Sequence, residues 1–320
     1  MDRHDRDDDR RGGISTTAGS VPWCPVAGRL LLTSMAQKSE LVSIIDTVPI
    51  SYFVYSSLSC FGRRRGGELP GMWFVRALTE AGRDLAAVRQ TLYRMEAEGE
   101  LLTRRAGRVK FYRATGVADG EIETGLAKIF QPAAPDWDGQ WTMVHLNLRG
   151  PANRVARERV VSLLAVQGFA LMGDEVYLHP RDVGRELAGA IGAAARAHVI
   201  IVRGPLTNVA ATPTILAHWR VPALNQRYRR VRIRLEELAR ALDRRVSDRD
   251  AFLLRFALVF DFLGVAWDDP DLPPAVLPAD WQGHAARELA ASLYRRLVEP
   301  ATRYSDRLLD GTSSSAGSPR

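Results

Sequence analysis

Two side chains of this sequence, Gln90 and Arg94, are of the types that read the edges of bases in a nucleic-acid duplex. Gln forms paired hydrogen bonds with adenine and Arg with guanine, and Arg is equally suited to a phosphate. On a helix these residues share one face with Ala87, and Arg89 and Tyr93 flank that face. Because a small residue lets a helix approach a groove closely, the pattern indicates a DNA-reading helix.

The helix that must position this face is predicted from Asp84 to the turn at Gly99. Asp is a good N-cap and Gly a common C-terminal stop. The face opposite the base-reading residues carries an apolar stripe at helical spacing, made of Leu85, Val88, Leu92 and Met95. Two further helices are predicted upstream, over residues 51–61 and 72–81, with Gly82 in the turn that follows them.

A β-hairpin is predicted directly after this helix, with strands over 102–105 and 108–112 and a turn at Ala106-Gly107. If Arg105 pairs with Arg108, strand alternation places one set of residues on a cationic face, Thr103, Arg105, Arg108 and Lys110. The other, packed face then carries Leu102, Val109 and Phe111. Like charges opposite one another repel, so a polyanion lying along this face would account for them.

Positive charge is concentrated in this part of the chain. Residues 63–113 hold twelve Arg and Lys against six Asp and Glu, whereas the whole chain has a net charge of +7. The loop at 63–67 adds Arg64 and Arg65. A helix and a basic hairpin in this order predict a winged helix-turn-helix that binds double-stranded DNA. The alternative is a winged helix used for protein contact, whose arginines only solvate the surface.

The middle of the chain has the element order β-α-β-β-α-β. The expected elements are a strand over 141–148, a helix over 152–167, a hairpin of strands over 169–172 and 176–179, a helix over 182–196 and a strand over 198–202. This order predicts a ferredoxin-like sheet with both helices on one face. RNA recognition is disfavoured because residues 198–202 hold no aromatic side chain for stacking. The first strand ends in Asn147-Leu148-Arg149, so a metal-dependent nuclease lacks an acidic ligand there.

The last third of the sequence is predicted to be helical over 223–245, 248–263 and 285–309, with a proline-rich loop at 268–283. Five arginines lie between residues 227 and 234. They could bind phosphates, but Glu236 and Glu237 lie close enough in sequence to pair with them. We favour a solvated helix face, because runs of charge are weak signals of binding.

The sequence therefore predicts a multidomain α+β protein. Its expected parts are an unstructured extension (1–38), a winged-helix domain (39–116), a linker helix (117–136), a ferredoxin-like domain (137–206), an all-α domain (207–309) and an unstructured tail (310–320). Met35 is a second candidate for the start of translation. The most apolar stretch, 41–61, is interrupted by Asp46 and Pro49, so no membrane span is expected. The acidic N-terminus does not fit a secretory signal, and we expect a cytoplasmic protein.

Catalytic motifs are not apparent in this sequence. It has no phosphate-binding loop, no dinucleotide fingerprint, no zinc-protease motif and no nucleophile elbow. Cys24 and Cys60 form neither a disulfide framework nor a metal-ligand spacing. We expect a protein that is not an enzyme and that needs no cofactor or metal.

Several stretches, in the right order, resemble the PaaX family of bacterial transcriptional repressors, which control phenylacetate degradation. They are VRQTLYRMEAEG at 88–99, WDGQW at 137–141, GFA at 168–170, DPDLP at 269–273, LPADWQG at 277–283 and LYRRL at 293–297. The resemblance spans about 42–307. It implies a homodimer that binds a palindromic operator and is released by an aryl-acetyl coenzyme A thioester such as phenylacetyl-CoA. The chain departs from the family at 258–263, LVFDFL, where members carry a His and, three residues on, an Arg.

The phosphates of a coenzyme A effector would need arginines, and the candidates are Arg149, Arg203 and Arg255. Each is equally compatible with a surface or interdomain ion pair. The rival functions are a metal-dependent nuclease or an acyl-CoA thioesterase built on the ferredoxin-like domain. Both require a metal site or a nucleophile that the sequence does not reveal.

Overall fold

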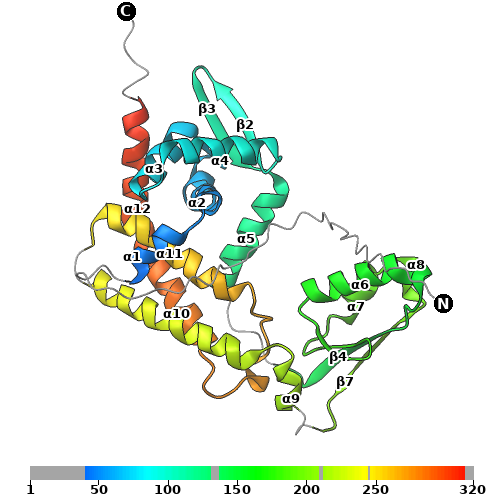
Figure 1. Ribbon diagram of the computed structural model, residues 1–320. Helices are drawn as coiled ribbons and strands as arrows, with labels where there is room; N and C mark the ends of the chain where they lie inside the picture. Colours follow the sequence, from blue (N-terminus) through cyan, green and yellow to red (C-terminus); the bar gives the residue numbers. More distant parts are fainter. Residues whose placement is uncertain (1–39, 131–136, 209–211, 244–245, 314–320) are drawn as a thin grey trace, which may run out of the picture. The chain divides into compact units, whose positions relative to one another are not determined.

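The computed structural model describes residues 40–130, 137–208, 212–243 and 246–313 as a mixed α+β protein with two antiparallel sheets (Figure 1). The expected extension at 1–38 lies outside the described residues, as does the end of the expected tail. The last helix continues to Ser313 and so includes the first four residues of that tail. The expected linker helix is described only up to Phe130.

The N-terminal elements include the predicted helices and hairpin in the predicted order. They are α1 (Glu40–Thr47), α2 (Ile50–Ser57), the π-helix η1 (Leu58–Gly62), η2 (Arg63–Arg65), β1 (Glu68–Pro70), α3 (Gly71–Glu80), α4 (Leu85–Ala97), β2 (Leu101–Ala106), β3 (Val109–Ala114) and α5 (Gly116–Phe130). Of these, α1, η2 and β1 were not predicted. The Asp84 carboxylate caps α4 by accepting a hydrogen bond from the Ala86 amide, 3.0 Å away. Val88, Leu92 and Met95 are buried as predicted, whereas Leu85 is exposed. Leu85 lies in the first turn of α4, where the helix has not yet reached the core.

The first sheet has the strand order β1-β3-β2, and its register corrects the predicted hairpin. Arg105 pairs with Lys110 and Ala106 with Val109, so the turn is Gly107-Arg108 and not Ala106-Gly107. Gly107 has a φ of +60°, a conformation that glycine adopts at no steric cost. Arg108 therefore lies in the turn, and Arg104 joins the face that holds Leu102 and Phe111.

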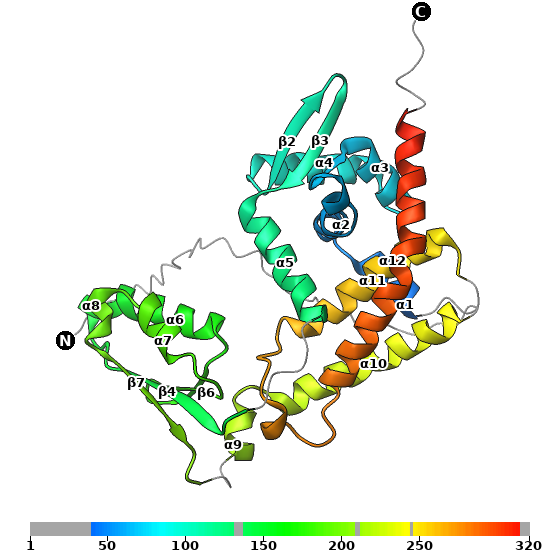
Figure 2. The same ribbon diagram turned by 180° about the vertical axis from the view of Figure 1, so that it is seen from behind.

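The middle region has the predicted order of elements around a four-stranded antiparallel sheet, β5-β6-β4-β7. They are β4 (Gln140–Leu146), η3 (Pro151–Asn153), α6 (Arg154–Val166), β5 (Ala170–Gly173), β6 (Val176–His179), α7 (Gly184–Ala190), α8 (Ala193–Arg196) and β7 (Val199–Pro205). The helices cover one face of the sheet (Figure 2), over a core that includes Val144, Leu146 and Leu164. The opposite face leaves Met143, Ile200 and Val202 exposed.

The C-terminal region is helical. Its elements are α9 (Thr212–Ala217), α10 (Val221–Leu242), α11 (Asp248–Ala266), η5 (Pro274–Val276) and α12 (Gly283–Ser313). Ser247 caps α11 by accepting from the Asp250 amide. Helix α11 is apolar on nearly all sides, as a helix surrounded by other elements must be, and most of its residues are buried.

The N-terminal and C-terminal regions share one hydrophobic core. Phe252 and Phe256 of α11 pack against Phe61, with ring centroids 5.3 Å and 6.1 Å from it. The indole N–H of the fully buried Trp73 donates to the Ser305 carbonyl of α12 at 3.1 Å. The N-terminal helices are thus completed by helices from the far end of the chain.

Candidate nucleic-acid interface

The exposed face of α4 holds most of the predicted base-reading residues. Arg89, Gln90 and Arg94 are exposed, and Tyr93 is 73% exposed, which is unusual for a large aromatic side chain. Ala87 is half-buried, and its neighbour Ala86 is exposed instead. At the start of α4 the open face therefore includes Ala86, where the prediction had placed Ala87. The open face of α4 thus combines polar side chains with one exposed aromatic ring.

Arg83 fixes the start of α4 relative to the first two helices. Its guanidinium donates to the carbonyl oxygens of Asp46 at 3.0 Å and Val48 at 2.8 Å, and also to that of Ile45. A cation at the C-terminal end of a helix interacts favourably with the free carbonyls there. Partial burial lowers the pKa of Arg83. This arginine is therefore occupied in holding the helix.

The face of the β2–β3 hairpin that was predicted to be cationic is only partly open. Lys110 forms an ion pair with Glu96 of α4, and the Thr103 hydroxyl donates to the same carboxylate at 2.8 Å. Tyr112, on that face, is buried edge-on against Phe74. The part of this face nearest α4 therefore contacts that helix, whereas Arg105 and Arg108, toward the turn, are exposed. The physical reason is that Glu96 offers partners to both polar side chains of this face.

The open face of the hairpin combines apolar and cationic side chains. Leu102 is 46% exposed and Val109 is 38% exposed. Arg104 stacks on the ring of Phe111, 4.8 Å from its centroid, and also pairs with Glu68 of β1. The hydrogen bond from Arg104 holds the pKa of Glu68 below its usual value. Sequence reasoning grouped Phe111 correctly with Leu102 and Val109, but it expected this face to be the packed one.

Several basic residues of this region are already neutralised by acidic partners. Arg63 pairs with Asp119 and Glu123, and Arg94 pairs with Glu98 one helical turn away. The remaining pairs are Arg65 with Asp306, Arg104 with Glu68 and Lys110 with Glu96. Between residues 63 and 113, all of which the structure describes, the exposed arginines without an ion pair are Arg64, Arg89, Arg105, Arg108 and Arg113. Arg113 was not predicted, although corrected strand alternation would have revealed it.

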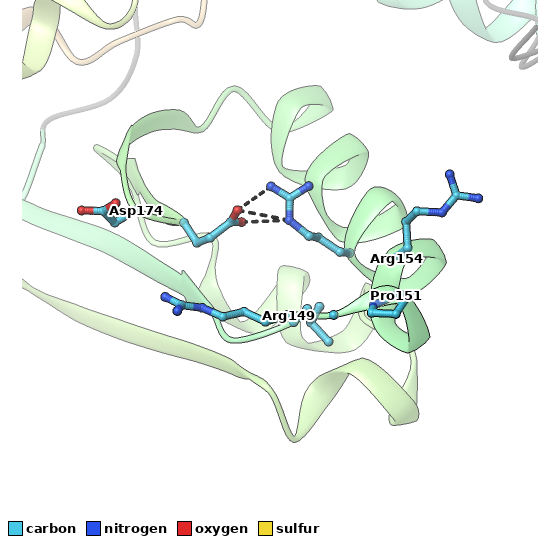
Figure 3. A pocket seen from close by; sticks show the side chains of 8 residues that line it. Arg149, Pro151, Arg154 and Asp174 are labelled. Atoms are coloured by element: carbon cyan, nitrogen blue, oxygen red, sulfur yellow. Dashed lines mark hydrogen bonds and ion pairs between the residues drawn. The ribbon is translucent and has the colours of Figure 1, made fainter. Parts of the chain in front are cut away.

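The three candidate ligand-binding arginines lie in different surroundings. Arg149 lines a cavity of about 520 Å³ with Gly150, Pro151 and Arg154, at the start of α6 (Figure 3). In the same cavity Arg157 is held by Glu175, with its Nε atom 3.1 Å from Oε1. Arg203 pairs instead with Asp138 and Asp182. Arg203 is therefore in an ion pair, whereas Arg149 forms none with the described residues.

Arg255 is buried, only 4% exposed, between two aromatic rings. Its guanidinium carbon lies 5.0 Å from the centroid of Phe61 and 4.5 Å from that of Tyr294. Its Nη2 atom donates to the Tyr294 hydroxyl at 2.6 Å. No solvent-facing ligand could reach this cation without a movement of the helices around it.

At the two positions of α11 where the sequence departs from the PaaX pattern, the side chains pack against neighbouring helices. Phe260 meets Tyr52 edge-on, with ring centroids 5.0 Å apart, and Leu263 is buried. Leu263 lies so close to Gly125 of α5 that a Cβ there would be 3.2 Å from it. Apolar residues at these positions therefore serve the contacts of α11 with α2, through Phe260, and with α5, through Leu263.

The arginine run of α10 is ion-paired along most of its length. Arg227 pairs with Asp268, Arg229 with Asp280, Arg232 with Glu236 and Arg234 with Asp261. The Arg234–Asp261 pair is bidentate, at 2.8 Å and 2.6 Å. This is the arrangement that the solvated, salt-bridged interpretation predicts.

Within the ranges the structure covers, no cluster of three or more His, Cys, Asp or Glu could hold a metal ion. None of the helices described there has the length and apolarity to cross a membrane.

Comparisons with known proteins bear on the family. Residues 219–307 match the family described as PaaX-like protein C-terminal domain. Over 272 residues the sequence is 28% identical to the transcriptional repressor PaaX of Escherichia coli strain K12, covering 81% of this chain and 83% of that protein. The chain is PaaX-like. The predicted resemblance is thereby confirmed, and the PaaX-like C-terminal domain comprises α10, α11, η5 and α12.

One solved structure resembles the fold of the PaaX-like chain. It is the uncharacterized protein Rv0674 from Mycobacterium tuberculosis, which is 20% identical in sequence. The superposition has a TM-score of 0.50 and covers 74% of this chain and 90% of that one. This similarity supports the α+β architecture.

Proposed function

We propose that this protein is a DNA-binding transcriptional repressor of the PaaX type. The observation that carries the proposal is the open face of α4, where Gln90 and Tyr93 lie beside the unpaired Arg89 in a chain related to a repressor. In this proposal α3 and α4 form the helix-turn-helix, β2 and β3 form the wing, and the middle region is a ferredoxin-like domain. A repressor of this kind works in the cytoplasm, beside the chromosome.

The proposed binding mode assigns different roles to the exposed residues. The open face of α4 enters the major groove, where Gln90 reads a base edge and Arg89 contacts a base or the phosphate beside it. Arg105 and Arg108 at the tip of the wing bind phosphates, and Arg64 lies in the loop that precedes β1. Lys110 and Arg94 hold acidic partners of their own. They contribute mainly by positioning the elements.

We expect a homodimer on a palindromic operator, because one recognition helix contacts only one half-site of such an operator. A surface suited to a second copy is the uncovered face of the middle sheet. Met143, Ile200 and Val202 are exposed there, and Met143 pairs with Val202 across β4 and β7. Contiguous exposed apolar side chains of this kind are typical of protein interfaces.

The proposed effector is an aryl-acetyl coenzyme A thioester such as phenylacetyl-CoA. The cavity at Arg149 and Arg154 has arginines that could receive its phosphates. Effector binding would lower operator affinity by a coupling free energy of about 1–3 kcal/mol.

The test is fluorescence anisotropy with a labelled duplex from upstream of the protein's own gene, at several salt concentrations. We expect binding below micromolar protein, a steep salt dependence, and release by phenylacetyl-CoA but not by free coenzyme A. Gln90→Ala should weaken binding, and Gln226→Ala, at an exposed position of α10, is the matched control. Magnesium-dependent cleavage of the duplex would favour the nuclease alternative, and loss of the thioester absorbance would favour the thioesterase.

A further inference from the structure

We propose that Cys60 is a site of reversible oxidation, at which a hydroperoxide converts the thiol to a sulfenic acid and thereby changes the DNA-binding elements. The regulatory part of this inference rests on the proposed repressor function. The chemical part rests only on the surroundings of the sulfur.

The sulfur belongs to a chain of polar groups inside the shared core. Cys60 Sγ lies 3.5 Å from the Tyr294 hydroxyl oxygen, and the same oxygen accepts a hydrogen bond from Arg255 Nη2 at 2.6 Å. The thiol and the guanidinium therefore flank one hydroxyl. Phe130 closes the site from α5, edge-on to Tyr294 with ring centroids 5.2 Å apart.

Arg255 is a buried cation that lacks acceptors. Its side chain is 96% buried, since 4% is exposed, and among the described residues its Nε and Nη1 atoms have no hydrogen-bond partner. Its one polar contact, Tyr294, is neutral. A buried cation without an anion or a full set of acceptors is costly, and the two aromatic rings offset only part of that cost. The site would be stabilised by a new oxygen acceptor.

The same cation assists the reaction at sulfur. Negative charge develops on a cysteine sulfur as it loses its proton and attacks an electrophile, and a guanidinium in a site of low dielectric stabilises that charge. Once an oxygen is attached to the sulfur, it can accept a hydrogen bond from Arg255. Arg255, whose hydrogen bonds are incomplete in the thiol form, thus stabilises both the transition state of the oxidation and its sulfenic acid product.

Cys60 is partly accessible to an oxidant and lies next to the elements that lead into the proposed DNA-binding region. It is half-buried, while Ser59 and Phe61 on either side are buried. It belongs to the π-helix η1, a type of turn that occurs often at functional sites. From η1 the chain passes directly to η2 and β1, and Phe61 packs on Trp73 of α3 with ring centroids 5.6 Å apart.

The reaction balances without a cofactor. The Cys60 sulfur attacks the outer oxygen of the hydroperoxide, a sulfur–oxygen bond forms, and the oxygen–oxygen bond breaks. The alkoxide that leaves takes up the proton released in the attack and departs as an alcohol. Sulfur is oxidised and the peroxide is reduced, and a thiol reductant reverses the step through a mixed disulfide.

The test of the chemistry uses the full-length Cys24→Ser variant, in which Cys60 is the only cysteine. It is treated with tert-butyl hydroperoxide, and the sulfenic acid is trapped with dimedone and quantified by mass spectrometry. Arg255→Met and Tyr294→Phe in the same background should each slow trapping about tenfold. Tyr294→Phe keeps the stacked ring, so it tests the proposal even if Arg255→Met fails to fold. Equal rates in a folded Tyr294→Phe variant, or no trapping in the parent, would overturn the assignment.

The test of the regulatory consequence compares operator affinity before and after oxidation. We expect at least about a fivefold loss of affinity, reversal by dithiothreitol, and no response in Cys24→Ser/Cys60→Ser. Oxidation that leaves affinity unchanged would overturn the regulatory part. Rapid trapping in a protein that binds no duplex in either state would support the site and would contradict the repressor function instead.

Discussion

Lys110 on β3 donates to the carboxylate of Glu96 near the end of α4, so an ion pair joins the β2–β3 hairpin to α4. The hydrogen bond from Lys110 lowers the pKa of Glu96, even though slight burial acts in the opposite direction. Both side chains are less than one-third exposed, at 28% and 30%. This contact decides which face of the hairpin is open.

The first prediction concerns this ion pair. Glu96→Gln should lower the free energy of unfolding by about 1 kcal/mol, because a partly exposed pair is worth no more than that. Urea unfolding of Glu96→Gln, Lys110→Met and the double variant would give the coupling energy. Strictly additive losses would show that the two residues do not interact in solution.

The second prediction separates base reading from phosphate binding. Gln90→Ala should relax base preference at one operator position by about 1–3 kcal/mol, while Arg105→Ala and Arg108→Ala should weaken binding to all sequences. Each arginine variant should also reduce the slope of log affinity against log salt by about one. Arg230→Ala, at an exposed position of α10, is the control. If all three variants bind like the parent, the open face of α4 and the wing are not the DNA contact.

The third prediction concerns acid stability. His179 is buried against Phe169, and burial lowers its pKa from 6.5 to about 4. The neutral imidazole is therefore favoured by folding, and the unfolded chain takes up a proton first as the pH falls. Stability should be complete above pH 6.5 and should decline by about 3 kcal/mol as the pH falls to 4.

Urea unfolding from pH 7 to pH 4 tests this dependence against His179→Leu. Carboxylates titrate over part of the same range in both proteins, so the difference between the two curves isolates the imidazole. As the pH is lowered, the unfolding free energy of the parent protein should fall more than that of His179→Leu. Parallel curves would mean that His179 takes up its proton equally well in the folded protein.

The fourth prediction addresses a buried network that joins several elements. Arg287 of α12 donates to Asp271 at 2.7 Å, and Lys128 of α5 reaches the same residue at 2.9 Å. Burial acts to raise the pKa of Asp271, but Lys128 and Arg287 together hold it below its usual value. Arg287→Met should cost about 3–5 kcal/mol, because it removes the cation paired with the buried Asp269 as well as one of the two cations at Asp271.

The control for this network is Arg240→Met, an arginine of α10 that is exposed. It should change the free energy of unfolding by less than about 0.5 kcal/mol. Calorimetry of both variants would check the difference. Equal melting temperatures would contradict the importance assigned to the Arg287–Asp271 pair.

Local sequence signals predicted many elements well. Asp84 and Gly99 mark the ends of α4 because capping and left-handed glycine are decided by a few neighbouring residues. The order of strands and helices between residues 140 and 205 also follows the prediction. The predicted helix over 182–196 is instead split into α7 and α8, with Ile191 in extended conformation between them.

The open face of the hairpin could not be predicted, because strand alternation defines two faces but does not determine which of them packs against the rest of the protein. Tertiary contacts of Glu96 and Phe74 decide between them. Likewise, the neutralisation of Arg65 by Asp306 depends on residues 241 positions apart. Charge counting along the sequence overestimates the free cationic surface for this reason.

The hydrogen bond between Trp73 and Ser305 has a genetic consequence. The last turns of α12 supply the acceptor for this indole, and Arg76 of α3 also donates to the Leu308 carbonyl there at 2.8 Å. A selection for loss of repression should therefore recover lesions near codons 300–309 as well as in the stretch encoding α4. Nonsense mutations among these lesions would abolish repression as mutations in α4 do, although they remove no residue of the proposed DNA-binding surface.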